Sequence, residues 1–203
     1  MYPGKYALQH PDRAAFIMAN TGEAVSYREF EARSNRLAHL LRAQGLKRLD
    51  HYSVFMENNN RYLEACSAGY RAGLYFTCIN SFLTPEELAY IVNNSESRLL
   101  ITSRAKLAVA AEALKSCPKV ALCLVVDGGA DLPAGCRDYA AAVAQYPAEA
   151  IADECLGTAM LYSSGTTGRP KGIVRPLPEQ PPSQPLPLFH FLHQLWRYRE
   201  DMI

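Results

Sequence analysis

The chain contains 203 residues, of which 49% are hydrophobic and 20% charged, and its formal net charge is +1. This composition is typical of a globular protein with a sizeable core, and the balanced charge gives no indication of a nucleic-acid-binding surface. No apolar run approaches the length of a transmembrane helix, and prolines and charges occupy the place of a secretory leader, so we expect a cytoplasmic protein without a transmembrane segment.

The N-terminal part predicts a β-hairpin that leads into a long helix. Residues 14–19 (AAFIMA) and 24–27 (AVSY) are apolar or β-prone and flank an Asn-Thr-Gly turn. Ser26 can cap the following helix, and Glu29 stands at the position of its capping-box partner. Apolar residues then recur at helical spacing, and Gly45 marks the expected end of this helix.

Alternating strands and helices are predicted from there to residue 156. Strands are expected over residues 52–56, 74–79, 99–102 and 120–126, and helices over 61–71, 105–115 and 138–145. A further helix starts at Thr84, where Pro85 takes the first helical position. The run 120–126 (VALCLVV) is continuously apolar, as in a strand covered on both faces. We therefore predict an α/β fold with a largely parallel sheet flanked by helices, whose ligands bind outside the carboxyl ends of the strands.

The most informative stretch is 158–176 (TAMLYSSGTTGRPKGIVRP). Its apolar run stops at Ser163, and apolar side chains other than proline resume only at Ile173. This pattern predicts a strand, a flexible loop and a second strand.

The composition of this loop suits phosphate oxygens. Gly165 and Gly168 permit backbone angles that a Cβ would forbid, so that successive N–H groups can turn toward one anion. Arg169 and Lys171 add positive charge that can follow a polyphosphate. Neutral hydroxyl donors are available from Ser163, Ser164, Thr166 and Thr167.

The spacing of the loop differs from that of a Walker A motif, which requires a glycine, four residues and then Gly-Lys-Ser/Thr. Here Gly168 follows Gly165 after only two residues, and Pro170 stands directly before Lys171. Because proline lacks an N–H group where a Walker loop would enter its helix, the P-loop NTPases are excluded.

The six cysteines show no pair separated by two residues, so neither a zinc site nor a Cys-x-x-Cys redox motif is predicted. Three of them, Cys66, Cys78 and Cys123, lie within apolar stretches and are predicted to be small core residues.

The C-terminal part has a different character. Residues 176–187 include six prolines and predict an extended spacer, although a ligand for SH3-like modules would also fit. Residues 188–203 predict an amphipathic helix that packs against a domain; peripheral membrane contact is the alternative. His190 and His193 lie three residues apart on that helix without an evident third ligand, so no metal site is predicted.

Residues 162–172 (YSSGTTGRPKG) resemble the phosphate-binding signature of the adenylate-forming enzymes, Tyr-Ser/Thr-Ser-Gly-Thr-Thr-Gly-x-Pro-Lys-Gly, at every defined position. Other stretches are similar to acyl-CoA synthetases, the AMP-forming acid–thiol ligases of this superfamily: residues 10–14, 34–38, 57–59 and 73–84. The resemblance extends over the chain up to the proline-rich spacer.

This resemblance implies ATP and coenzyme A as co-substrates and Mg²⁺ as cofactor. It also implies a carboxylic acid as substrate, and we expect a fatty acid. The acid would attack the α-phosphate of ATP, and the thiol of coenzyme A would then displace AMP. It further implies that the loop wraps the phosphates and that Lys171 supplies the catalytic counter-charge. The implied cofactor-binding residues are Ser163, Ser164, Gly165, Thr166, Thr167, Gly168 and Lys171.

The resemblance also implies that members are more than twice as long as this chain, so we expect an incomplete N-terminal part of an adenylate-forming domain. Residues 1–175 would be that portion, 176–187 the spacer and 188–203 the start of the remainder. The chain alone is then expected to be inactive as an acyl-CoA synthetase. The alternatives are a catalytically inactive nucleotide-binding fragment and an interaction protein that uses the proline-rich segment and the final helix.

Overall fold

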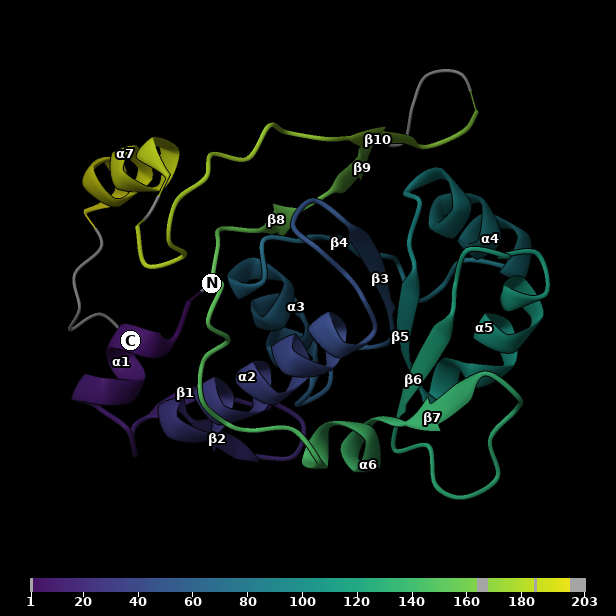
Figure 1. The fold of residues 1–203 in the computed structure, drawn as a ribbon, viewed down its shortest axis with the longest axis horizontal. Helices are drawn as coiled ribbons and strands as arrows, with labels where there is room; N and C mark the ends of the chain where they lie inside the picture. The colour runs from purple at the N-terminus through teal and green to yellow at the C-terminus, as the bar shows by residue number, and fades with distance from the viewer. Residues whose placement is uncertain (1, 164–167, 185, 198–203) are drawn as a thin grey trace.

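A parallel β-sheet forms the centre of the molecule. The computed structural model describes residues 2–163, 168–184 and 186–197, and Figure 1 shows the sheet crossing the middle of the fold. Its strand order is β7-β6-β5-β3-β4-β8, and every neighbouring pair is parallel. The strands are β3 (His51–Phe55), β4 (Tyr75–Cys78), β5 (Leu99–Ser103), β6 (Leu122–Val126), β7 (Cys136–Asp138) and β8 (Thr158–Ala159). The predicted parallel α/β sheet is therefore confirmed.

Helices cover both faces of this sheet (Figure 1). One face carries α2 (Tyr27–Ala43), α3 (Tyr62–Arg71) and α6 (Tyr139–Ala144). The other carries α4 (Pro85–Asn94), the 3₁₀ turn η1 (Arg104–Lys106) and α5 (Leu107–Leu114). All five residues of β5 and of β6 are buried, because each strand contributes side chains to both cores.

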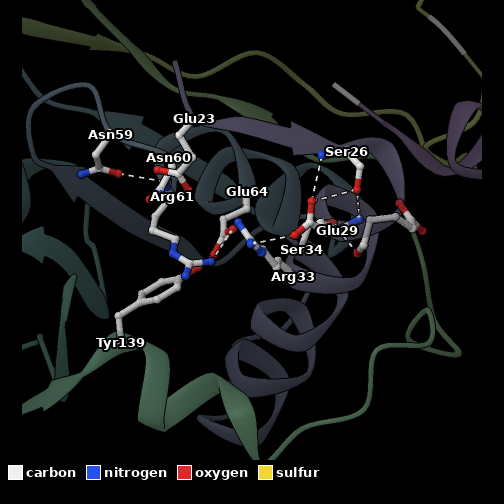
Figure 2. A network of polar contacts seen from close by, with 11 residues as sticks. Glu23, Ser26, Glu29, Arg33, Ser34, Asn59, Asn60, Arg61, Glu64 and Tyr139 are labelled. Atoms are coloured by element: carbon white, nitrogen blue, oxygen red, sulfur yellow. Dashed lines mark hydrogen bonds and ion pairs between the residues drawn. The ribbon is translucent and has the colours of Figure 1, made fainter. Parts of the chain in front are cut away.

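Two helix starts follow the predicted capping chemistry. The Ser26 side chain accepts the N–H of Glu29, whose carboxylate accepts the N–H of Ser26 in return, as Figure 2 shows. Thr84 and Glu87 form the same reciprocal pair at the start of α4, with Pro85 in the first helical position. Ahead of α2, β1 (Ala14–Ile17) and β2 (Ala24–Ser26) form the predicted antiparallel hairpin.

A buried carboxylate joins α3 to α6. Glu64 is 1% exposed and accepts a 2.8 Å hydrogen bond from the hydroxyl of Tyr139, and Arg61 lies 3.3 Å from its other oxygen (Figure 2). Burial raises the pKa of Glu64, and the charge of Arg61 opposes that rise. The two helices are thus connected through a polar group inside an otherwise apolar layer.

The structure also contains elements that the sequence did not predict. Helix α1 (Gly4–Gln9) has no buried residue, and β7 is a three-residue edge strand without a fully buried residue, so neither has a recognisable apolar pattern. Cys78 is exposed, and its prediction as a core residue was wrong. The reason is its place as the last residue of β4, where the strand leaves the covered part of the sheet.

The C-terminal part crosses the surface. Strands β9 (Leu161–Ser163) and β10 (Lys171–Ile173) form a separate antiparallel ribbon, and an extended segment leads from it to α7 (Pro187–Trp196). Arg48 donates to the carbonyl of Leu177, and the N–H of Leu156 donates to that of Gln180, so the proline-rich segment is attached to the fold. Within the described part of the chain, no helix is long and apolar enough to cross a membrane.

Candidate phosphate-binding site

The two stems of the candidate loop form the β9–β10 ribbon, which follows β8 outside the main sheet (Figure 1). The predicted single strand is divided in two: β8 pairs with β4 in the main sheet, and β9 pairs with β10 outside it. Met160 lies between them with 5% exposure, and its N–H donates to the carbonyl of Phe76 in β4. The chain thus leaves the sheet at its carboxyl end, where ligands of parallel sheets bind.

Three of the predicted phosphate ligands lie among the described residues. Ser163 is the last residue of β9 and is paired with Lys171, the first residue of β10, so the ribbon places these two residues opposite each other at the two stems of the loop. Both residues are exposed. Gly168 has a φ of +85°, a conformation that favours glycine. The others, Ser164, Gly165, Thr166 and Thr167, lie outside the described residues.

Helix α4 contacts both stems of the loop. The hydroxyl of Tyr90 donates a 3.0 Å hydrogen bond to the carbonyl of Pro170 on the second stem. One helical turn later, Asn94 accepts a 2.6 Å hydrogen bond from the hydroxyl of Tyr162 on the first stem. Tyr90 and Asn94 lie four residues apart and therefore share a face of α4.

Aromatic and electrostatic contacts reinforce this attachment. The guanidinium of Arg169 lies over the ring of Tyr90, 5.2 Å from its centroid, and this cation–π contact places the positive charge beside α4. Burial, followed by the nearby Tyr90 hydroxyl, raises the pKa of Tyr162 to about 12, so Tyr162 stays a neutral hydrogen-bond donor at physiological pH.

A hollow of about 300 Å³ opens between α4 and the second stem. Its lining residues include Glu86, Glu87 and Tyr90 of α4 and the chain from Gly168 to Pro170. The acidic pair belongs to the first turn of α4, where it faces the positive end of the helix dipole.

The ribbon is closely packed at Gly172 in β10. A Cβ at this position would lie 2.3 Å from the terminal methyl carbon of Met160 and 3.0 Å from the nearest ring carbon of Tyr162. A larger residue at position 172 would therefore require the end of the Met160 side chain to move.

Sequence reasoning missed the contribution of α4 to this site. Tyr90 and Asn94 are separated from their loop partners by 80 and 68 residues. The sequence offered one signal: Tyr90 and Asn94 are four residues apart, so their polar groups share one face of the helix. This helix follows a strand of the parallel sheet, and ligands bind at the carboxyl ends of such strands.

The described residues contain no group of three His, Cys, Asp or Glu side chains that could hold a metal ion. This part of the chain therefore does not fit a resident Mg²⁺ site, and we derive no role for its side chains in binding Mg²⁺. A divalent ion would arrive here on the phosphates of a nucleotide.

In a comparison with known protein families, residues 5–177 match the family model described as "AMP-binding enzyme". A 3-oxocholest-4-en-26-oate–CoA ligase of Rhodococcus rhodochrous is 35% identical over 172 residues, which are 81% of this chain and 30% of that protein. A medium-chain-fatty-acid–CoA ligase of Ectopseudomonas oleovorans is 30% identical over 83% of this chain and 32% of its own length. The chain thus spans about a third of the length of these curated relatives.

Solved structures share the fold. A structure described as a long-chain-fatty-acid CoA ligase from Rhodopseudomonas palustris superposes with a TM-score of 0.77 at 21% identity, over 98% of this chain and 48% of that one. The anthranilate CoA ligase AuaEII, solved with anthranoyl-AMP, gives a TM-score of 0.72 at 18% identity, over 84% of this chain and 32% of that one. These likenesses show that the arrangement of strands and helices described above is that of CoA ligase structures.

Proposed function

Because the chain belongs to the AMP-binding enzyme family, we propose that it forms the N-terminal portion of an AMP-forming acid–CoA ligase. The observation that carries this proposal is the β9–β10 ribbon, which follows β8 outside the main sheet and places Ser163 and Lys171 opposite each other at the two stems of a loop of the signature sequence. ATP, a carboxylic acid and coenzyme A would be the substrates, with Mg²⁺ accompanying the nucleotide.

The proposed part of this chain in the reaction is to hold the phosphates of ATP. When a carboxylate oxygen attacks the α-phosphorus, the bond to the bridging oxygen breaks and pyrophosphate leaves with the negative charge. Hydroxyl, N–H and ammonium groups that are fixed before the reaction stabilise such charge efficiently. The proposed ligands are Ser163, Ser164, Gly165, Thr166, Thr167, Gly168 and Lys171.

A fatty acid is the proposed substrate class. It is supported by the printed names of relatives, among them a medium/long-chain-fatty-acid–CoA/3-oxocholest-4-en-26-oate–CoA ligase of Mycobacterium tuberculosis that is 31% identical over 169 residues. A cytoplasmic location agrees with the use of ATP and coenzyme A. Residues 1–175 would belong to the adenylation domain, 176–187 to the spacer and 188–203 to the start of the following segment.

A chimeric enzyme tests this function. Residues 5–177 of this chain would replace the matched segment of the Rhodococcus ligase, and pyrophosphate release would be measured with ATP, octanoate and 3-oxocholest-4-en-26-oate. The parent ligase is the positive control, and the same ligase without its N-terminal segment is the negative control. We expect acid-dependent pyrophosphate release by the chimera, whereas a folded chimera with no more release than the negative control would contradict the proposal.

The 203-residue chain alone should form no acyl-CoA, because it spans only about a third of the length of the ligases that it resembles. Acyl-CoA formation by the isolated chain would overturn the proposal that it is one portion of the active unit.

A further inference from the structure

Two cysteine thiols face each other between α3 and the end of β4. The Sγ atoms of Cys66 and Cys78 lie 3.6 Å apart. Cys66 is 6% exposed, whereas Cys78 is exposed at the carboxyl edge of the sheet. A dissolved reagent can therefore reach the thiol of Cys78, whereas the thiol of Cys66 is buried next to it.

The surroundings of the pair favour reaction at the outer thiol. Two hydrogen bonds lower the pKa of Cys78 to about 7: the larger effect comes from the thiol of Cys66 and the smaller from the hydroxyl of Tyr62. The same contact with Cys78, together with burial, raises the pKa of Cys66. Because the thiolate is the nucleophilic form, Cys78 is the more reactive of the two at neutral pH.

We propose that Cys66 and Cys78 form a reversible disulfide site, in which Cys78 reacts first with a hydroperoxide and Cys66 resolves the product. Hydrogen peroxide accepts the two electrons: the Cys78 thiolate attacks one oxygen, the O–O bond breaks, and a sulfenic acid and hydroxide are formed. The sulfur of Cys66 then attacks the sulfur of Cys78, the S–O bond breaks, and a second hydroxide takes up the proton of Cys66 as water. The proposal is independent of the ligase function.

A second cysteine pair provides an internal comparison. Cys123 and Cys136 stand directly opposite each other on the parallel strands β6 and β7. Their thiols also contact each other, and this contact lowers the pKa of Cys136 to about 7 and raises the pKa of Cys123. Neighbouring strands lie about 4.8 Å apart, whereas the Cβ atoms of a disulfide are about 3.8 Å apart, so a link between Cys123 and Cys136 would require the two strands to move closer together. Cys66 and Cys78 belong instead to a helix and a strand that face each other, so their side chains can converge. We therefore expect only the first pair to become linked.

Peptide mapping distinguishes the two pairs. The purified chain would be treated with hydrogen peroxide, its remaining thiols blocked with N-ethylmaleimide, and the product digested with trypsin without reduction. Cleavage after Arg61, Arg71 and Arg98 places Cys66 and Cys78 in the peptides 62–71 and 72–98, each with one cysteine, whereas Cys123 and Cys136 share the peptide 120–137. We expect the first two peptides to appear linked and to separate on treatment with dithiothreitol.

Three variants extend the test. Cys66→Ser should leave Cys78 as a sulfenic acid that dimedone traps, and Cys78→Ser should abolish the link. Tyr62→Phe should slow the loss of the Cys78 thiol at pH 7 by about two- to fivefold, because a hydrogen bond that stabilises the thiolate is lost. The matched control Tyr6→Phe, on α1, should react at the rate of the parent chain. Oxidation of Cys78 to a sulfinic acid without linkage, or linkage of Cys123 to Cys136 alone, would overturn the proposal.

Discussion

Tyr90 and Pro170 are 80 residues apart in the chain, yet the hydroxyl of Tyr90 donates a 3.0 Å hydrogen bond to the carbonyl of Pro170. This bond attaches the second stem of the signature loop to α4, and the Tyr162–Asn94 bond attaches the first. The stems of the candidate phosphate site are therefore held by a helix that belongs to the main α/β fold.

Removing either attachment should loosen the ribbon. Tyr90→Phe and Asn94→Ala each delete one hydrogen bond, which contributes about 0.5–1.5 kcal/mol, so local opening should become about two- to tenfold more frequent. Trypsin cleavage after Lys171 measures this opening without any ligand, since the bond after Arg169 is protected by Pro170. Tyr6→Phe on α1 is the control. Unchanged cleavage in both loop variants would show that α4 does not hold the stems.

Lys171→Ala should weaken binding of ATP while leaving the fold intact. The side chain is exposed in β10, and a charged hydrogen bond to phosphate contributes about 1.5–3 kcal/mol, which corresponds to a loss of about ten- to a hundredfold in affinity. Titration calorimetry measures the change, and circular dichroism checks the fold. Lys119→Ala is the matched control, because Lys119 pairs with Glu96 on the surface away from the loop. Equal affinities of the two variants would remove Lys171 from the site.

Two glycine variants should differ in severity. A Cβ at Gly157 would lie 2.1 Å from the carbonyl oxygen of Gly69 and 2.6 Å from that of Leu74, so Gly157→Ala must displace backbone. The obstacle at Gly172 is mainly the flexible end of Met160. We expect Gly157→Ala to cost about 3 kcal/mol and Gly172→Ala about 1 kcal/mol, with Met160→Ala relieving the clash in the second case. Urea unfolding provides the comparison, and the reverse order would contradict the assignment of a backbone obstacle to Gly157 and a side-chain obstacle to Gly172.

Glu64 should make stability depend on pH in a defined direction. Its folded-state pKa is raised, mainly by burial, so the folded chain binds this proton more tightly than the unfolded chain. The free energy of unfolding contributed by Glu64 is therefore highest below its ordinary pKa and declines as pH rises through the raised value. Glu64→Gln keeps an acceptor for Tyr139 and removes this titration. The stability advantage of the parent chain over the variant should shrink as the pH rises above about 4.5, the ordinary pKa of a glutamate. A difference in urea unfolding that does not change with pH would contradict the assignment.

The parts of the fold that depend on neighbouring residues were predictable from the sequence. Ser26 with Glu29 and Thr84 with Glu87 are capping boxes whose partners lie three residues apart, and both occur as predicted. The run at β6 is apolar because both of its faces are covered. Short elements without such a pattern, α1 and β7, could not be recognised because they bury few side chains.

The signature loop was recognisable as a candidate site, but its support was not. Phosphate-binding chemistry follows from glycines, hydroxyls and cations that are consecutive in the chain. The role of Tyr90 and Asn94 depends on the position of α4 beside β9 and β10, which the local sequence does not encode. The convergence of Cys66 and Cys78 has the same origin, since it arises from the packing of α3 against β4.

Titration calorimetry of the purified 203-residue chain with ATP and Mg²⁺ tests the central claim most directly. The Thr166→Ala/Thr167→Ala double variant is the control, because it removes two proposed hydroxyl ligands and leaves Tyr90 and Asn94 in place to hold the stems. We predict saturable binding of one ATP to the parent chain and at least about tenfold weaker binding to the double variant. Absence of binding to a folded parent chain, or equal binding to both chains, would contradict the assignment of this loop as a phosphate site.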